Sequence, residues 1–286
     1  MSLSLILAIV FPVISVALFK EFEKREVNSL QAIIFNYFGA VIIGLFLFIT
    51  PNQLTEINSQ PWFYSSIFVG FLFLLNFYLI AKAAIINGIS IATFSNKISL
   101  IIPVLFTVIY LNESLTYLKW IGILLALGSI YLITRSNNQE ENNRMKFVFP
   151  LLIFLFTGIL ESLINWTQKT HFQTSDEVSY FTISSFGISL VFGILILLIQ
   201  WKKIELKNLI AGLILSVPNT LGVFFFIQAL NQNSNSSSIL PVLHIGSLTL
   251  AVVIGYFVYK EKINRINLIG IGVAIAAIIL LQLNFG

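Results

Sequence analysis

The chain has 286 residues, of which 57% are hydrophobic and only 10% are charged, against about 25% charged in an ordinary soluble domain. This composition excludes a soluble enzyme, a secreted disulfide scaffold and a disordered chain, because so few polar groups cannot cover a water-exposed surface. The absence of cysteine excludes disulfides and thiolate metal sites. The net charge of +4 suits a membrane protein with basic cytoplasmic loops better than a nucleic-acid binder, which needs a contiguous basic face. We therefore predict a polytopic membrane protein.

Ten apolar stretches are long enough to cross a bilayer, which requires roughly 20 mostly apolar residues for about 30 Å. In chain order they are residues 2–19, 30–49, 62–84, 90–110, 117–134, 147–168, 179–200, 208–230, 237–258 and 266–284. Continuous runs rather than short alternating segments indicate helices, not barrel strands. We predict an all-α integral membrane fold with ten transmembrane helices, the first of them an uncleaved span because no basic residues precede it.

Polar and turn-forming residues separate the stretches. The longest polar stretch, 135–146, predicts a linker between two halves, 1–134 and 147–286. Proline predicts kinks or local unwinding inside the spans, at Pro12, Pro103, Pro241 and Pro218-Asn219. The four tryptophans fall near segment ends, as in an interfacial belt: Trp62, Trp120, Trp166 and Trp201.

Positive charges are concentrated on one side of the predicted bilayer. The side opposite the N-terminus has 13 of the 16 Lys and Arg residues: Lys20, Lys24, Arg25, Lys82, Arg135, Arg144, Lys146, Lys202, Lys203, Lys207, Lys260, Lys262 and Arg265. The other side has Lys119 and Lys169, and Lys97 lies inside the fourth segment. The positive-inside rule places the charged side in the cytoplasm and both termini outside the cytoplasmic (inner) membrane.

The two halves match at a constant offset of 148 residues. The matched positions include Ser90 and Ser238, Ser99 and Ser247, Glu113 and Glu261, and Gly122 and Gly270. Because each half has five spans, the second half enters the membrane from the opposite side. This pattern predicts an inverted-topology repeat, an architecture common among secondary transporters, rather than a generic bundle.

The connection between the fourth and fifth segments reads Asn112-Glu113-Ser114-Leu115-Thr116…Trp120-Ile121-Gly122, with an echo at Lys260-Glu261…Ile269-Gly270. It resembles the G-E-x-L-T-x-x-x-W-I-G motif of the EamA domain in the drug/metabolite transporter superfamily, with Asn112 in place of Gly. The resemblance implies two five-helix repeats whose first, third and fourth helices line a central cavity. It also implies cytoplasmic termini, opposite to the charge count.

Three ionisable side chains lie inside the predicted spans: Lys97, Glu161 and His244. Such groups are costly in a bilayer, at about 2.5–3.5 kcal/mol or more, and usually face a cavity or a partner. Lys97 and Glu161 each lie about seven residues, or roughly 10 Å, from one membrane boundary. We interpret Lys97 as a substrate-binding cation or a snorkelling lysine, and Glu161 as a proton-coupling carboxylate or a structural ion pair.

His244 is expected near the outer depth of Glu161, within reach of it, while Lys97 lies nearer the inner side. Uncharged polar groups inside the spans are further candidates for solute binding or for bonds between helices: Asn36, Asn76, Asn96, Asn165 and Asn219. Glu113 and Glu261, which just precede the fifth and tenth segments, are interpreted as structural helix caps, and Gly122 and Gly270 as structural motif residues.

We predict a secondary transporter that moves a small metabolite (an amino acid, a neutral or an amphipathic solute) by alternating access, with proton-coupled export as one hypothesis. No P-loop motif is present, so ATP does not drive it directly. The alternatives are a passive channel or facilitator and an integral-membrane enzyme. We expect no cofactor and no metal, membrane lipid and a small solute as partners, no nucleic acid, and a monomer or homodimer.

Overall fold

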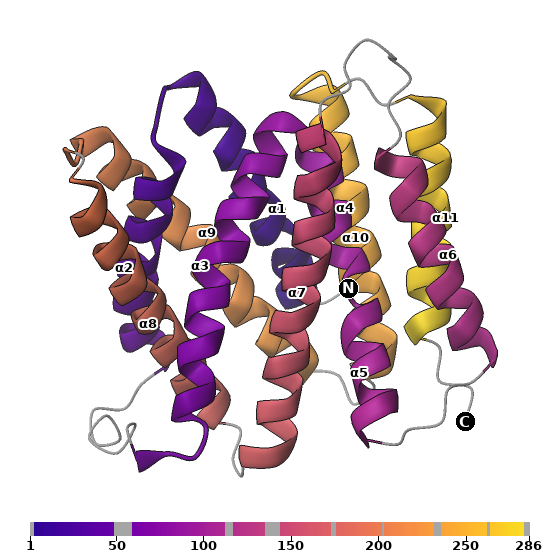
Figure 1. Cartoon of the computed structure of the whole chain (residues 1–286), viewed down its shortest axis with the longest axis horizontal. Coiled ribbons are helices and arrows are strands. Elements are labelled where there is room, and N and C mark those ends of the chain that lie inside the picture. Colours follow the sequence, from indigo (N-terminus) through magenta and orange to yellow (C-terminus); the bar gives the residue numbers. More distant parts are fainter. Residues whose placement is uncertain are drawn as a thin grey trace. The chain divides into compact units, whose positions relative to one another are not determined.

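The computed structural model describes residues 3–48, 59–111, 117–134, 144–172, 176–201, 203–231, 236–261 and 264–282. These residues form eleven helices (Figure 1): α1 (Leu3–Lys24), α2 (Ser29–Phe48), α3 (Phe63–Ile86), α4 (Ile89–Ile98), α5 (Ile101–Leu111), α6 (Tyr117–Thr134), α7 (Arg144–His171), α8 (Asp176–Gln200), α9 (Leu206–Asn231), α10 (Ser236–Phe257) and α11 (Arg265–Gln282). The predicted all-helical class is confirmed. Six of the helices are long and apolar enough to cross a membrane, and shorter apolar helices accompany them.

The predicted segment 90–110 is the one that differs most, because it is divided into α4 and α5. The break falls at Ser99 and Leu100, just before Pro103. Proline has no N–H to donate, and its ring clashes with the carbonyl four residues earlier, which here belongs to Ser99. That carbonyl instead accepts the N–H of Ile102 at 2.9 Å, in a tighter turn. Proline therefore interrupts this helix rather than only kinking it.

The other sequence-predicted boundaries need smaller corrections. Helix α9 continues through Pro218-Asn219, so the predicted local unwinding is wrong, and α1 likewise continues through Pro12. Membrane helices tolerate proline because neighbouring groups can satisfy the released carbonyl. Helix α7 begins at Arg144, which places the last three residues of the predicted linker inside a helix, and the rest of the linker lies outside the described residues.

The chain packs as two compact units, each combining segments from both sequence halves. The first unit comprises residues 1–20, 79–158 and 222–286, and the second comprises 21–78 and 159–221. Helices α1, α3, α7 and α9 contribute residues to both units. This division follows packing and is not a test of the predicted repeat.

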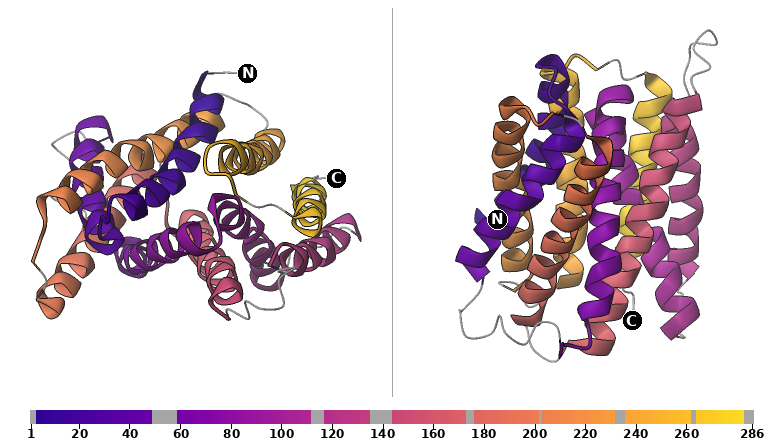
Figure 2. Two further views of the ribbon diagram at one scale, coloured as in Figure 1. Left: turned by 90° about the horizontal axis from the view of Figure 1, so that it is seen from above. Right: turned by 60° about the vertical axis from the view of Figure 1, so that its left-hand side comes forward.

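In the first unit, α6 packs against α11 and α4 packs against α10. Figure 1 and Figure 2 show α11, in yellow, alongside α6, in magenta. Ala126, Ala274 and Ala277 in these two helices are fully buried. Small side chains let membrane helices approach closely, which matters because apolar burial alone drives little association in lipid. Phe94 and Leu248 extend the same core between α4 and α10.

In the second unit, α2 and α8 pack in antiparallel orientation at two glycines. A Cβ added to Gly193 would lie 2.7 Å from a carbon of Ile34, and one added to Gly44 would lie 2.9 Å from a carbon of Ile183. From the first contact to the second, the residue number increases along α2 and decreases along α8, so the two helices are antiparallel. Glycine is needed at both positions because no larger residue fits against the facing isoleucine.

Trp62 is not part of an interfacial belt, contrary to the sequence prediction. Its side chain is 1% exposed and makes edge-to-face contacts with Phe181 at 5.9 Å and Phe172 at 6.4 Å between ring centroids. Such pairs are a favoured aromatic geometry. Trp201 is 92% exposed, as the belt predicts, and Trp120 is also exposed.

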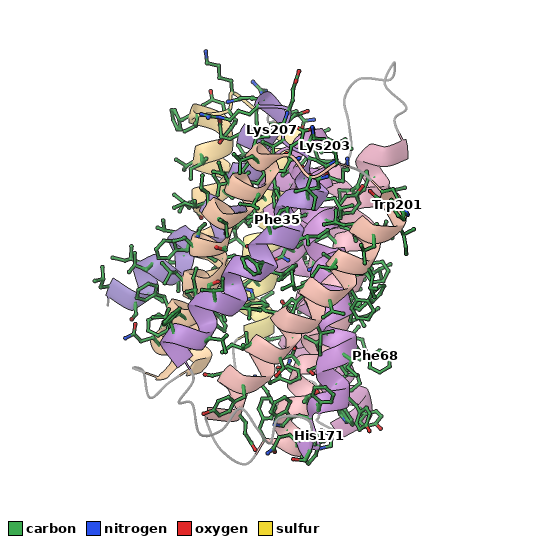
Figure 3. All side chains as sticks on the ribbon, turned by 90° about the vertical axis from the view of Figure 1, so that its left-hand side faces the viewer. Phe35, Phe68, His171, Trp201, Lys203 and Lys207 are labelled. Carbon is green, nitrogen blue, oxygen red and sulfur yellow. The ribbon has the colours of Figure 1, made fainter. Side chains whose placement is uncertain are left out.

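The second unit groups at one end connections that the span count assigns to the same side of the bilayer. In the second unit, Trp201, Lys203 and Lys207 lie at the end opposite His171 (Figure 3). Asn28, which precedes α2, is bonded to Asn208 at this same lysine-bearing end. The alternation of the chain across the predicted bilayer is therefore consistent within the unit, and the cytoplasmic assignment of this end stays a prediction.

A buried amide network joins the N-terminal ends of α2 and α9. The Gln31 side chain donates to the Lys203 carbonyl at 3.1 Å and accepts from Asn208 Nδ2 at 2.7 Å. Asn208 Oδ1 accepts the Asn28 N–H at 2.9 Å, and Asn28 Oδ1 caps α2 by accepting the N–H groups of Leu30 and Gln31. These residues fix the ends of the two helices.

Replacing Gln31 by Leu is expected to destabilise the protein by about 1–3 kcal/mol, because the buried amide of Asn208 loses its acceptor and the Lys203 carbonyl loses its side-chain donor. Chemical denaturation in detergent would measure the change. Gln200→Leu is the matched control, since Gln200 is exposed at the end of α8. Equal stability of the two variants would contradict a structural role for the network.

Candidate functional site

Helices α4 and α10 bring three of the predicted site residues together in the first unit. The two helices meet where Ser90 Oγ donates to the Ala251 carbonyl at 3.5 Å. They run antiparallel, since the end of α10 and the residues after it approach the start of α4. Lys97 lies seven residues after Ser90 in α4, and His244 lies seven residues before Ala251 in α10. Seven residues are nearly two full turns, so this pair lies on the same faces about 10 Å further along.

Lys97 and His244 interact electrostatically, in agreement with this geometry. His244 is 9% exposed, and among the residues that the structure describes its Nδ1 has no hydrogen-bond partner. Lys97 is half-buried. The α4–α10 pair thus combines a half-buried cation with a buried ring nitrogen that has no hydrogen-bond partner within the described residues.

The sequence prediction placed His244 at an outer depth and Lys97 nearer the inner side, and this is wrong. The two residues lie at the same level of the α4–α10 pair. The error came from counting depth from opposite segment ends without the contact that sets the register of the two helices. Position 244 is near the middle of α10, and position 97 is near the middle of the combined α4–α5 segment.

Asn96 extends the site toward α7, where its amide donates to Thr157 Oγ1 at 3.3 Å. Thr93, one turn before Lys97, is buried, and its hydroxyl has no partner among the described residues. Thr157 was not among the predicted site residues. It lies four residues before Glu161 in α7, so the helical period of that polar face would have identified it.

Lys97 occupies the last turn of α4, because the helix ends at Ile98. The C-terminal end of a helix has a partial negative charge and unpaired carbonyls, which a cation stabilises. Ser99 Oγ donates to the Asn96 carbonyl at 2.6 Å and satisfies one of them. Because α4 ends at this point, unpaired carbonyls are present that stabilise the charge of Lys97. A continuous helix would not offer them.

The remaining predicted polar residues belong to the second unit. Asn36 in α2 is fully buried, and neither polar atom of its side chain has a hydrogen-bond partner within the described part of the chain. The adjacent Tyr37 and Phe77 of α3 have ring centroids 6.2 Å apart. Asn76 is also buried.

Glu161 and Asn165 are half-buried on α7, four residues apart and therefore on one face. Asn219 is half-buried on α9, directly after Pro218. The predicted contact between Glu161 and His244 stays a prediction. Within the described residues no three His, Asp or Glu side chains form a group that would hold a metal ion, and the expectation of a metal-free protein also stays a prediction.

Glu261 caps a helix, as predicted, but not the helix that follows it. Its Oε1 accepts the Ile89 N–H at 2.6 Å, and its Oε2 accepts Ser90 Oγ at 2.9 Å, so it caps α4. Gly122 and Gly270 are both buried, and each is the sixth residue of its helix. Glu113 lies outside the described residues.

The model of the EamA-like transporter family matches residues 1–135. This part of the chain is similar to EamA-like transporters. The resemblance predicted from the Glu113 turn is confirmed for these residues, and together with the apolar helices it indicates a multi-pass membrane transporter. Members of this family are transporters rather than enzymes.

Two further comparisons cover nearly the whole chain. An uncharacterized protein of Haemophilus influenzae is 27% identical over 287 residues, and the match covers 96% of each protein. A solved crystal structure superposes with a TM-score of 0.58 at 11% identity, again covering 96% of each chain. At this identity the second comparison shows likeness of fold alone.

Proposed function

We propose that this protein is a secondary transporter that moves a small metabolite across the cytoplasmic membrane by alternating access. The observation that carries the proposal is the register of α4 and α10, which places Lys97 and His244 at the same level, each seven residues from the contact of Ser90 with Ala251. In transporters built from repeats, the solute binds where equivalent helices of the two repeats meet. The argument therefore depends on whether α4 and α10 are equivalent.

The helix boundaries support a repeat with an offset of 148 residues. Helix α6 spans 117–134 and α11 spans 265–282, so both of their ends correspond. The family match ends at residue 135, close to the predicted end of the first repeat. By the same offset, α4 and α5 together correspond to α10, and α2 corresponds to α8.

The contacts between α2 and α8 are compatible with the symmetry that an inverted repeat requires. A two-fold operation converts a contact between residues i and j into one between j−148 and i+148. The contact of Ile34 with Gly193 predicts one between residues 45 and 182, and the structure has Gly44 against Ile183. The agreement to within one residue is compatible with a two-fold axis between α2 and α8, although antiparallel packing alone also produces it, because the operation leaves the sum of the two residue numbers unchanged.

The same operation converts the pair Lys97 and His244 into residues 96 and 245. The pair is thus its own image to within one residue, as expected for side chains beside a two-fold axis. A site on such an axis is equally distant from two equivalent gates, which is what alternating access needs.

The chemistry of these residues favours a solute with one acidic or polar group. Lys97 would pair with a carboxylate, and Asn96 and His244 would supply hydrogen bonds that fix its orientation. One cation is too few for a phosphate-rich solute, which usually requires several basic groups. We propose an amino acid or a similar neutral or amphipathic metabolite. Asn36, Asn76, Asn165 and Asn219 stay separate candidates for solute binding in the second unit.

Proton coupling through Glu161, export as the direction, and extracytoplasmic termini complete the proposal. The last rests on the 13 to 2 distribution of positive charges between the two sides. A passive channel or facilitator is the main alternative, and an integral-membrane enzyme is less well supported, because the sequence has no convergent acid–base motif.

Counterflow in liposomes distinguishes a transporter from a channel. Vesicles that contain the protein and are preloaded with unlabelled amino acids should take up labelled amino acids faster than empty vesicles, because a carrier exchanges solute through one site. A channel would give equal initial uptake in both cases. Protein-free liposomes provide the control, and uptake independent of preloading would contradict alternating access.

A further inference from the structure

The carboxylate of Glu261 holds the N-terminal end of α4 from a distant part of the chain. Besides Ile89 N–H and Ser90 Oγ, it accepts the Ser90 N–H at 3.4 Å, and Lys20 Nζ lies 3.2 Å from Oε1. Gly88, the residue before α4, provides no side-chain cap of its own. The carboxylate therefore supplies the cap that the local sequence lacks, with negative charge at the positive end of the helix.

Two glycines leave room for this carboxylate. Gly88 has a φ of +100°, and a Cβ there would lie 2.7 Å from the Glu261 carboxyl carbon. A Cβ on Gly255 would collide with Glu261 Oε2 and lie 2.6 Å from Ser90 Oγ. The backbone is thus adapted to one carboxylate in one position.

The segment that bears Glu261 is itself fixed to neighbouring elements. The Glu261 N–H donates to the Gly255 carbonyl at 2.9 Å, and the Tyr259 hydroxyl donates to the Ala17 carbonyl at 3.2 Å. A cavity of about 180 Å³ adjoins the ion pair and is lined in part by Asn87 and Asn267.

Helix α4 has only ten residues and is separated from α5 by the break at Ser99, so its N-terminal cap has a large influence on its position. Lys97 lies at the opposite end of this short helix. A rotation or axial shift of α4 at its cap would be transmitted to Lys97 and Asn96, since an α-helix of this length moves as a rigid rod.

We propose that Glu261 is a positioning residue for the solute site. By capping α4, it holds Lys97 and Asn96 opposite His244. The inference rests on the proposed function of these three residues, but the position of α4 can be measured without any solute.

Disulfide formation between cysteines introduced at positions 97 and 244 measures this position. The chain has no native cysteine, so only the introduced pair reacts. In the full-length protein in liposomes, Glu261→Ala should lower the rate of cross-linking by about fivefold, as expected for a lost N-cap. Glu261→Gln retains an acceptor for the Ile89 N–H and should lower it by about twofold. Lys20→Met retains the whole cap and should leave the rate nearly unchanged.

A second cysteine pair and a second carboxylate provide the controls. Phe11 and Phe225 stack at 5.8 Å between centroids in the same unit, and cross-linking of cysteines at these positions should not respond to Glu261. Glu205→Ala removes an exposed carboxylate that is paired with Lys207, and it should change neither rate.

Equal rates for Glu261→Ala and the parent, or an equal loss at both cysteine pairs, would overturn the proposal. If Glu261→Ala does not fold, the comparison of Glu261→Gln with Lys20→Met decides it, because only the former alters the cap. A selective loss of cross-linking combined with normal solute binding in Lys97→Met would instead uphold the positioning role and reject the proposed function.

Discussion

Replacing Lys97 by Met is expected to weaken solute binding by at least about tenfold, because a charge-assisted hydrogen bond to a buried ion contributes roughly 1.5–3 kcal/mol. Methionine matches the length and apolar character of the lysine stem, so the change removes the charge with little loss of packing. A thermal-shift screen of a metabolite library against the purified protein would identify stabilising solutes. The same solutes tested on the variant should then give little or no shift.

Lys207→Met is the matched control for this prediction. Lys207 is paired with Glu205 at 3.1 Å on the surface, so its loss should leave the solute-dependent shift unchanged. His244→Gln retains hydrogen-bonding capacity without a titrating ring and should have a smaller effect than Lys97→Met. Equal shifts for Lys97→Met and the parent would assign Lys97 a purely structural role at the end of α4.

Hydropathy predicted the helices well because membrane crossing imposes a simple requirement on composition and length. The predicted segment 117–134 coincides with α6, and the other long segments differ from the observed helices by a few residues at their ends. The division of the segment at Ser99 was harder to predict from the sequence. Pro103 indicated a disturbance, but proline alone does not distinguish the broken α4–α5 segment from the continuous α9.

The candidate site was predicted as a set of residues but not as an arrangement. The cost of an ionisable group in lipid identified Lys97 and His244 from the sequence. That these two lie level with each other depends on the register between α4 and α10, which is fixed by contacts of residues far apart in the chain. For the same reason the sequence did not reveal that Glu261 caps α4, because its partner Ile89 lies 172 residues away in the chain.

Trp62 illustrates the opposite case, in which a local rule was applied too broadly. Its place beside a segment end is typical of an interfacial tryptophan such as the exposed Trp201. The aromatic neighbours Phe172 and Phe181 bury it instead. Proximity to a helix end predicts depth in the membrane, but not whether lipid or protein surrounds the ring.

Replacing Glu161 by Gln is expected to abolish the pH dependence of transport while leaving expression and folding intact. Glutamine has nearly the same shape and retains hydrogen bonding, but it cannot take up or release a proton. If Glu161 carries the coupled proton, the parent protein should transport faster as the imposed proton gradient is increased, and the variant should be insensitive to it. Transport of a solute identified by the thermal-shift screen, measured in liposomes over a range of pH values, tests this directly.

Glu205→Gln is the control, because Glu205 lies in the connection between α8 and α9 and pairs with Lys207 at the surface. Its loss should not alter the pH profile. Glu161 occurs on α7 beside Asn165, on a polar face that a purely structural helix in lipid would have little reason to maintain. If Glu161→Gln retains the full pH dependence, Glu161 is not the coupling group. His244 would then be the residue to test, and loss of the profile in His244→Gln would move the coupling step to the α4–α10 site.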